Sequence, residues 1–243
     1  MFAVSLNIPP LSELLLMALL TLSWSYCCLT FTAYLKTTRL LHTGYTRKVF
    51  HVLIFLSAVF VHAIAGFVGV CVFGTMVSIV VGHAVMSGSG NPMYEAIARE
   101  QDGKHRTYFI VIPYFATLIG GLASSVLFGP LAVVGYLVGG LGDAAGEPVG
   151  TRWGTHRYAH HGLGESHSTK TFEGSIGVVV ASAVALVIAV GIRPELHLDL
   201  QSAIAVPAIA IVCGFVEALS PRGWDNVPMQ VVPTVLAAVL LTR

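Results

Sequence analysis

Long apolar stretches recur along the chain and constrain its fold more than any other feature. A helix that crosses a bilayer needs roughly 20 mostly apolar residues. The chain as a whole is poor in charge: 10% of its 243 residues are charged, against about 25% in soluble domains. So few charges cannot cover the surface of a water-soluble domain of this size, and the mean hydropathy is +0.80. The sequence therefore predicts an all-α fold, a polytopic integral membrane bundle of helices.

Eight segments qualify as candidate transmembrane helices, and seven is the alternative because the second and the eighth are short. A tight turn is expected at residues 63–66, and Pro130 separates the fourth segment from the fifth. We treat residues 1–243 as one membrane-embedded catalytic domain, with a peripheral first helix in residues 1–40 and a motif-bearing core in residues 45–235. The segments are residues 14–35, 49–62, 66–86, 108–128, 131–149, 175–192, 200–219 and 227–241.

Charge and cysteine content exclude several other classes of protein. A net charge of +1 offers no basic face for nucleic acid, and high hydrophobicity excludes a disordered chain. The N-terminus lacks the basic region of a cleaved signal peptide. The four cysteines lie inside apolar segments at spacings that suit neither zinc nor a redox dithiol, so we expect small buried side chains. They are Cys27, Cys28, Cys71 and Cys213.

Lysine and arginine are distributed unevenly between the two sides that eight crossings create. Eleven of the 13 fall on one side, and Arg193 and Arg243 fall on the other. The positive-inside rule makes the first side cytoplasmic and places both termini away from the cytoplasm. Most acidic residues fall on that same side, where nucleotides are available. The eleven are Lys36, Arg39, Arg47, Lys48, Arg99, Lys104, Arg106, Arg152, Arg157, Lys170 and Arg222.

Residues 139–150, with the sequence GGLGDAAGEPVG, hold the densest group of unusual residues. Asp143 and Glu147 are four residues apart, so their carboxylates share one face of a helix and could anchor Mg²⁺ together with substrate phosphates. Gly142, Gly146 and Gly150 form a stripe where another backbone can approach closely. The alternative is a packing motif whose acids lie in the headgroup layer. Because a charge within a span costs about 2.5–3.5 kcal/mol, we favour the functional interpretation.

The segment that follows carries basic residues and four histidines, and it leads into the sixth apolar segment. Lysine, glycine and serine at a helix N-terminus suit phosphate binding, because backbone N–H groups and the helix dipole face the anion. The alternative is an ordinary helix start with Thr171 as N-cap and Glu173 in the first turn. The histidines, His156, His160, His161 and His167, are expected to form a polar loop rather than a zinc site.

Two weaker groups of residues complete the set. Residues 47–51 open the second apolar segment, where the positive-inside rule alone explains the two basic residues. Asp225 and Asn226 open the eighth segment, and Glu217 lies eight residues before Asp225, close enough to share a site. An acid within a membrane segment is a functional candidate by default. The standard phosphate-binding loops of nucleotide enzymes are absent from the sequence.

In this order, the motifs of residues 142–150, 170–175, 217 and 225–226, with Arg47, Lys48 and His51, resemble the polyprenol kinase family. That family includes phytol and farnesol kinases, dolichol kinase and the CTP-dependent diacylglycerol kinase, and the resemblance covers roughly residues 45–235. It implies a membrane kinase that moves the γ-phosphate of a nucleotide, typically CTP, to a lipid hydroxyl with Mg²⁺. Thr171 and Pro148 depart from the pattern. The chain is also shorter than dolichol kinases usually are.

The expected function is that of a lipid kinase with a role for each candidate residue. The lipid acceptor would be an isoprenoid alcohol (phytol, farnesol, geranylgeraniol or a polyprenol) or diacylglycerol. The alternatives are a phosphatidate cytidylyltransferase-like CDP-lipid synthase, whose C-terminal signature is absent, and a polytopic transporter. The expected catalytic residues are Asp143, Lys170, Glu173 and Asp225, with Glu173 or Asp225 accepting the alcohol proton, and the expected Mg²⁺ ligands are Asp143 and Glu147. The expected nucleotide-binding residues are Gly142, Arg152, Lys170, Thr171, Gly174 and Ser175. The expected substrate-binding or structural residues are Arg47, Lys48, His51, Glu217 and Asn226.

Overall fold

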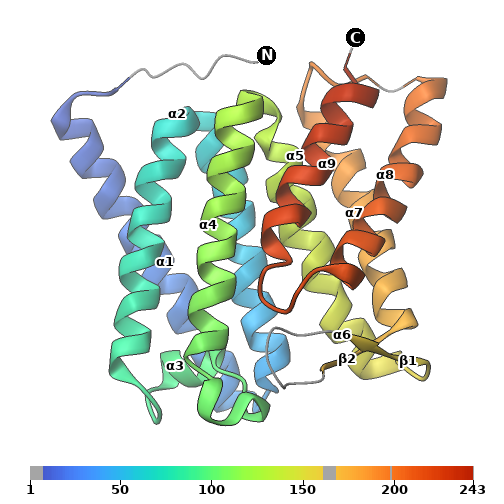
Figure 1. The fold of residues 1–243 in the computed structure, drawn as a ribbon. Coiled ribbons are helices and arrows are strands. Elements are labelled where there is room, and N and C mark those ends of the chain that lie inside the picture. The colour runs from blue at the N-terminus through green and yellow to red at the C-terminus, as the bar shows by residue number, and fades with distance from the viewer. Residues whose placement is uncertain (1–7, 161–167, 198, 243) are drawn as a thin grey trace. The chain divides into compact units, whose positions relative to one another are not determined.

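A computed structural model describes residues 8–160, 168–197 and 199–242, and most of these residues are helical (Figure 1). Five helical stretches are long and apolar enough to cross a membrane, so the expected class of polytopic helical membrane protein is confirmed. These stretches are Leu11–Thr38, Thr43–Ser87, Tyr108–Trp153, Phe172–Ile192 and Ser202–Leu219, and a shorter apolar helix spans Asn226–Leu240.

The elements alternate between long helices and short connecting turns. In chain order they are α1 (Leu11–Thr38), α2 (Thr43–Ser87), α3 (Pro92–Ile97), the 3₁₀ turn η1 (Glu100–His105), α4 (Tyr108–Phe128), the 3₁₀ turn η2 (Gly129–Leu131), α5 (Ala132–Leu137), the π-helical turn η3 (Val138–Gly142), α6 (Asp143–Trp153), β1 (Arg157–His160), β2 (Ser168–Thr171), α7 (Phe172–Ile192), α8 (Leu200–Leu219) and α9 (Asn226–Leu240). The antiparallel pair β1–β2 was not expected from the sequence. It pairs Tyr158 with Lys170.

Two helical stretches are about twice the length that one crossing needs, and both are interrupted where the sequence predicts. At 1.5 Å per residue, the 45 residues of α2 would extend about 68 Å if the helix were continuous. Gly66 breaks it with φ 58° and ψ −151°, a conformation that is essentially restricted to glycine. In the 46-residue stretch, Gly129 (φ 51°) and Pro130 interrupt the helix. The described residues thus place a helix at each expected segment, and the number of crossings stays a prediction.

The helices form two compact units, which we describe separately. One comprises Ser5–Ile112, with α1, α2, α3, η1 and the beginning of α4. The other comprises Pro113–Arg243, with the rest of α4 and all later elements. The expectation of a single domain stays a prediction.

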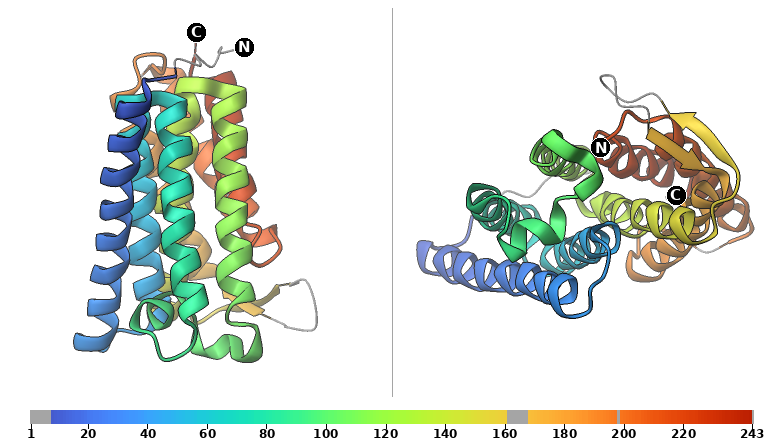
Figure 2. Two further views of the ribbon diagram at one scale, coloured as in Figure 1. Left: turned by 90° about the vertical axis from the view of Figure 1, so that its left-hand side faces the viewer. Right: turned by 90° about the horizontal axis from the view of Figure 1, so that it is seen from below.

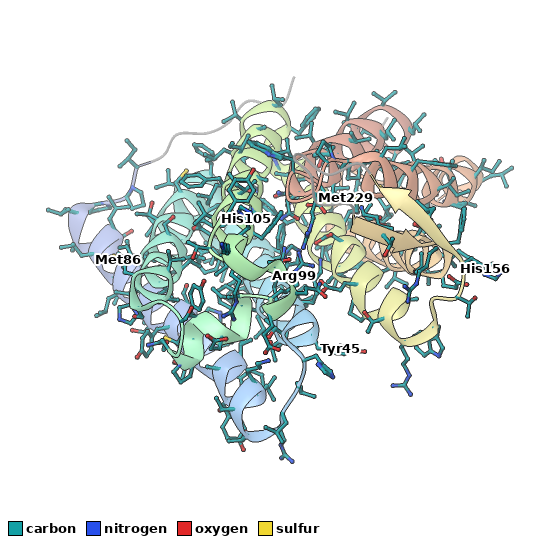
Figure 3. The ribbon with its side chains drawn as sticks, turned by 60° about the horizontal axis from the view of Figure 1, so that its bottom comes forward. Tyr45, Met86, Arg99, His105, His156 and Met229 are labelled. Carbon is teal, nitrogen blue, oxygen red and sulfur yellow. The ribbon has the colours of Figure 1, made fainter. Side chains whose placement is uncertain are left out.

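In the unit of residues 5–112, hydrogen bonds tie the polar connection after α2 to the start of that helix. The Thr43 and Thr46 hydroxyls donate to the backbone carbonyls of Glu95 and Ala96. The Arg106 guanidinium binds the Glu95 carboxylate and the Ala98 carbonyl, and this pairing holds the pKa of Glu95 below its usual value. Arg99, labelled in Figure 3, pairs with Asp102 at 3.2 Å. Arg99 and Arg106 therefore pair with acidic residues of the same connection.

In the unit of residues 113–243, α7 lies at the centre and contacts α5, η3, α6 and α8. The helices α6, α7 and α8 run side by side in the views of Figures 1 and 2. Two amide side chains connect α9 to α4. Asn226 Nδ2 donates to the Pro113 carbonyl at 3.1 Å, and Gln230 Nε2 donates to the Thr117 carbonyl at 3.0 Å. These bonds fix the start of α9, which carries Asp225 as its N-cap.

Replacing Gly66 by alanine should destabilise the protein by about 1–3 kcal/mol, because an alanine at this φ and ψ is strained. The matched control is Gly82→Ala, since Gly82 has ordinary helical geometry and a Cβ there would meet no atom within 4 Å. Thermal unfolding of the purified variants in one detergent measures both. Equal melting temperatures for the two variants would contradict the role of Gly66 in the turn.

Candidate functional site

A π-helical turn lies directly before Asp143. The stretch from Ala132 to Trp153 is continuous helix except that Val138–Gly142 forms i→i+5 hydrogen bonds. Such turns are rare and occur frequently at functional sites, because the inserted residue rotates the following side chains relative to the preceding ones. Asp143 is the first residue after the turn, and it is 6% exposed. The turn therefore sets the direction of this carboxylate within the helical unit.

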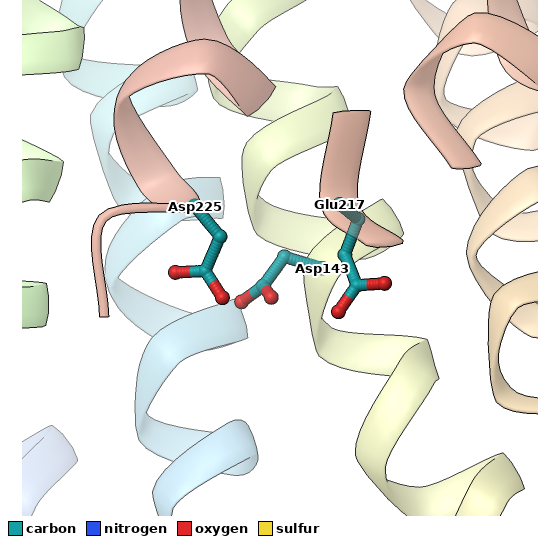
Figure 4. Close-up of side chains that lie close together, drawn as sticks. All are labelled: Asp143, Glu217 and Asp225. Carbon is teal, nitrogen blue, oxygen red and sulfur yellow. The ribbon is translucent and has the colours of Figure 1, made fainter. Parts of the chain in front are cut away.

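Three acidic residues from three helices meet at this point (Figure 4). Asp143 begins α6, Glu217 lies in the last turn of α8, and Asp225 is the N-cap of α9. One carboxylate oxygen from each lies within 4.8 Å of the other two. Asp143 and Glu217 are buried and Asp225 is half-buried. We call these residues the three-acid group.

Lys170 of β2 contacts the three-acid group through Glu217. Its Nζ donates to Glu217 Oε1 at 2.6 Å and also to the Glu217 backbone carbonyl. That carbonyl would normally accept from the N–H of the residue four positions later, which is Pro221 and has no N–H. Lys170 supplies the missing donor, and its positive charge suits the carboxyl end of a helix. Lys170 thus caps α8 and binds the side chain of Glu217 at the same time.

The predicted glycine stripe allows α6 to lie close against α7. A Cβ at Gly142 would lie 2.4 Å from Ser182 Oγ, and one at Gly150 would lie 2.7 Å from Thr171 Oγ1. From the facing helix, a Cβ at Gly174 would lie 2.9 Å from the Gly146 carbonyl oxygen. These distances leave no room for side chains, so close backbone approach, as the sequence predicts, is confirmed. The structure thus gives Gly142 and Gly174 packing roles, and their expected nucleotide contacts stay predictions.

The polar residues of segment 170–175 all have partners within their own unit. Thr171 is the N-cap of α7, and its hydroxyl accepts from the Gly174 N–H at 3.1 Å. This is the ordinary helix start that the sequence offers as an alternative to phosphate binding. Glu173 Oε1 accepts from Thr155 Oγ1 at 2.6 Å and lies 2.7 Å from Nδ1 of His156, which Figure 3 labels. The Ser175 hydroxyl bonds the Tyr158 hydroxyl at 2.8 Å. These bonds connect the β1–β2 hairpin and the residues before it to α7.

Several residues expected at the site are not part of the three-acid group. Glu147, the second expected metal ligand, is half-buried on α6 and is not a member of the group. Arg152 is exposed, lies over the Trp153 ring and follows Asp143 by nine residues, about 13 Å along the helix. Glu173 is also not a member. His161 and His167 lie outside the described residues, as does the side chain of His160, so the polar loop stays a prediction.

The remaining expected residues divide between the two units. Arg47, Lys48 and His51 lie near the start of α2, in the unit of residues 5–112, so the structure does not test their part in the site. Glu217 and Asp225 lie close together, as the sequence predicts, and their function in one site stays a prediction. That Asp143 joins them was not predicted, because the sequence contains no local signal for packing between α6, α8 and α9.

The chemistry of the three-acid group suits a small divalent cation. Mg²⁺ prefers oxygen ligands and is usually held in proteins by carboxylates together with substrate phosphates. Carboxylates that are largely buried need nearby positive charge, because leaving them uncompensated is costly. The donor set of Asp143, Glu217 and Asp225 therefore fits the expected Mg²⁺, and it does not include Glu147.

Comparison with known proteins gives one relative of stated function. A protein described as a phytol kinase, from Synechocystis sp., is 30% identical to this chain over 147 residues. The match covers 60% of this chain and 58% of that protein, so the chain spans little more than half of its relative. This similarity supports the resemblance to the polyprenol kinase family. No family model matches the chain, and no solved structure matches it.

Replacing Gly142 by alanine should destabilise the protein, because the new Cβ would lie 2.4 Å from Ser182 Oγ. Replacing Ser182 by alanine removes that oxygen, which is buried and without a hydrogen-bond partner among the described residues, so this change alone should be neutral or stabilising. We expect Gly142→Ala to cost about 1–3 kcal/mol and the double variant to recover most of the loss. Thermal unfolding of the three variants measures this. No recovery in the double variant would contradict the close contact.

Proposed function

We propose that this chain is a membrane-embedded kinase that transfers a phosphoryl group from a nucleotide to the hydroxyl of a prenol-type lipid. The observation that carries the proposal is the three-acid group with Lys170, at one end of a unit built from apolar helices. The similarity to a phytol kinase supports the reaction class. By resemblance to the polyprenol kinase family, the donor is CTP and the cation is Mg²⁺.

In this proposal Asp143, Glu217 and Asp225 would hold Mg²⁺. Such an ion would supply positive charge next to the transferring phosphoryl group, which is most of what phosphoryl transfer requires besides positioning. Asp225 is the least buried of the three acids and is the N-cap of α9. We assign one oxygen of its carboxylate to the ion and the other oxygen to accepting the proton from the lipid hydroxyl. Glu173, the other candidate, already binds Thr155 and His156.

The end of the unit that carries the three-acid group exposes apolar side chains, as a substrate that remains in the bilayer would require. Phe172 and Ile176 are exposed at the end of α7 that follows Lys170. Phe215 and Leu219, on the face of α8 opposite to Glu217, are 63% and 79% exposed. A lipid alcohol could keep its hydrocarbon chain against the exposed side chains of α7 while its hydroxyl reaches the acids. A prenyl chain meets this requirement without any polar headgroup.

Purified protein incubated with CTP labelled in either the α- or the γ-phosphate tests the reaction directly. Phytol, farnesol, geranylgeraniol and diacylglycerol serve as separate acceptors, in the presence of Mg²⁺. We expect γ-label in the lipid product and no α-label, with a prenol as the preferred acceptor. Transfer of α-label would indicate a CDP-lipid synthase, and absence of any labelled lipid would contradict the kinase assignment.

Neutralising Asp143 or Asp225 should remove most activity. We expect Asp143→Asn and Asp225→Asn each to lower kcat/KM at least about 100-fold, a loss of about 2.7 kcal/mol in transition-state stabilisation. The control is Glu195→Gln, because Glu195 pairs with Arg193 beyond the opposite end of α7. Steady-state kinetics on inserted, monodisperse protein measure the variants. A larger loss in Glu147→Gln than in Asp225→Asn would instead favour the metal ligands expected from sequence.

A further inference from the structure

Lys170 and Glu217 form an ion pair that is largely shielded from solvent. Their side chains are 19% and 11% exposed, and Nζ lies 2.6 Å from Oε1. The ammonium group has three donors, and two of them already bind Glu217, one at the carboxylate and one at the backbone carbonyl. The Lys170 side chain is therefore committed to the end of α8.

The backbone of Lys170 is also fixed on both sides. Lys170 is paired with Tyr158 in the β1–β2 hairpin. The next residue, Thr171, caps α7 through the Gly174 N–H. Two consecutive residues thus cap the end of α8 and the start of α7. A lysine held in this way acts as a fixed charge and not as a flexible side chain that follows a ligand.

We propose that Lys170 is the permanent counter-ion of Glu217 and that it acts on the reaction through this acid, without contacting phosphate. The inference rests on the proposed function, because it concerns the cation and the nucleotide of that same site. Lys170 makes the three-acid group less negative by one charge. It thereby weakens the hold on a divalent cation and lowers the repulsion of a phosphate anion. Lys170 is accordingly a positioning and charge-balancing residue.

Removing Lys170 and removing Glu217 should have opposite effects on cation binding. Charges a few ångströms apart in a largely buried site interact strongly, because little water screens them. Lys170→Met removes one positive charge, so the group should bind a cation more tightly and repel a nucleotide more. Glu217→Gln removes one negative charge and one strong ligand, so cation binding should weaken. The double variant Lys170→Met/Glu217→Gln restores the net charge of the wild type.

The experiment measures Mn²⁺ binding without nucleotide, by electron paramagnetic resonance of the full chain in nanodiscs. We expect Lys170→Met to bind Mn²⁺ at least about tenfold more tightly and Glu217→Gln about tenfold more weakly. The double variant should lie within about fivefold of the wild type, and Lys170→Arg, which keeps the charge, within about threefold. Thr171→Ala is the matched control: it removes the neighbouring cap, so it should lower stability and leave Mn²⁺ affinity unchanged.

The nucleotide KM of the same variants separates this role from phosphate binding. We expect Lys170→Met to raise the KM for CTP and the double variant to return it to within about threefold of the wild-type value. A double variant that keeps the raised KM would overturn the inference, since a phosphate contact cannot be restored by neutralising Glu217. Unchanged Mn²⁺ affinity in Lys170→Met would also overturn it.

Two further outcomes are also decisive. If Lys170→Met does not fold because Glu217 is left buried without its counter-ion, the double variant still carries the test, because charge balance predicts a near-normal KM and phosphate contact a raised one. Wild-type protein that binds no Mn²⁺ in an Asp143-dependent manner would contradict the proposed function itself, and the role of Lys170 with it. Mn²⁺ binding by the wild type with no response to Lys170→Met would contradict only the inference.

Discussion

The ion pair between Lys170 and Glu217 is the interaction on which the charge balance of the site depends. It joins the end of α8 to the hairpin, and the residue after Lys170 caps α7. The face of α7 that follows this cap packs against the glycines after Asp143. Since α7 packs against both α6 and α8, Asp143 and Glu217, which lie far apart in the sequence, come to lie with carboxylate oxygens within 4.8 Å of each other.

Much of the architecture follows from local chemistry and could be predicted. The apolar segments predict the helices, and the breaks fall at Gly66 and Gly129–Leu131, where glycine and proline disfavour continuous helix. The stripe of Gly142, Gly146 and Gly150 predicts close packing because it leaves one helix face without side chains. Each of these features is encoded within a few consecutive residues, so no knowledge of tertiary contacts is needed.

The composition of the three-acid group could not be predicted in the same way. Helical spacing pairs Asp143 with Glu147. The structure instead groups Asp143 with Glu217 and Asp225, because α8 ends and α9 begins near the start of α6. The π-turn before Asp143 likewise contacts α7 and α9, which are distant from it in the sequence. One local signal does exist: Pro221 leaves the Glu217 carbonyl without a helical donor, and in the structure the Lys170 ammonium group donates to it.

We therefore assign helix capping and charge balance to segment 170–175, and cation binding to acids from three other segments. The most direct measurement of this division is an anomalous difference map from crystals of the protein grown with Mn²⁺. We expect a peak bonded to carboxylate oxygens of Asp143, Glu217 and Asp225, with Lys170 Nζ still on Glu217. A peak on Glu147 and Asp143 alone, or none among these residues, would contradict it.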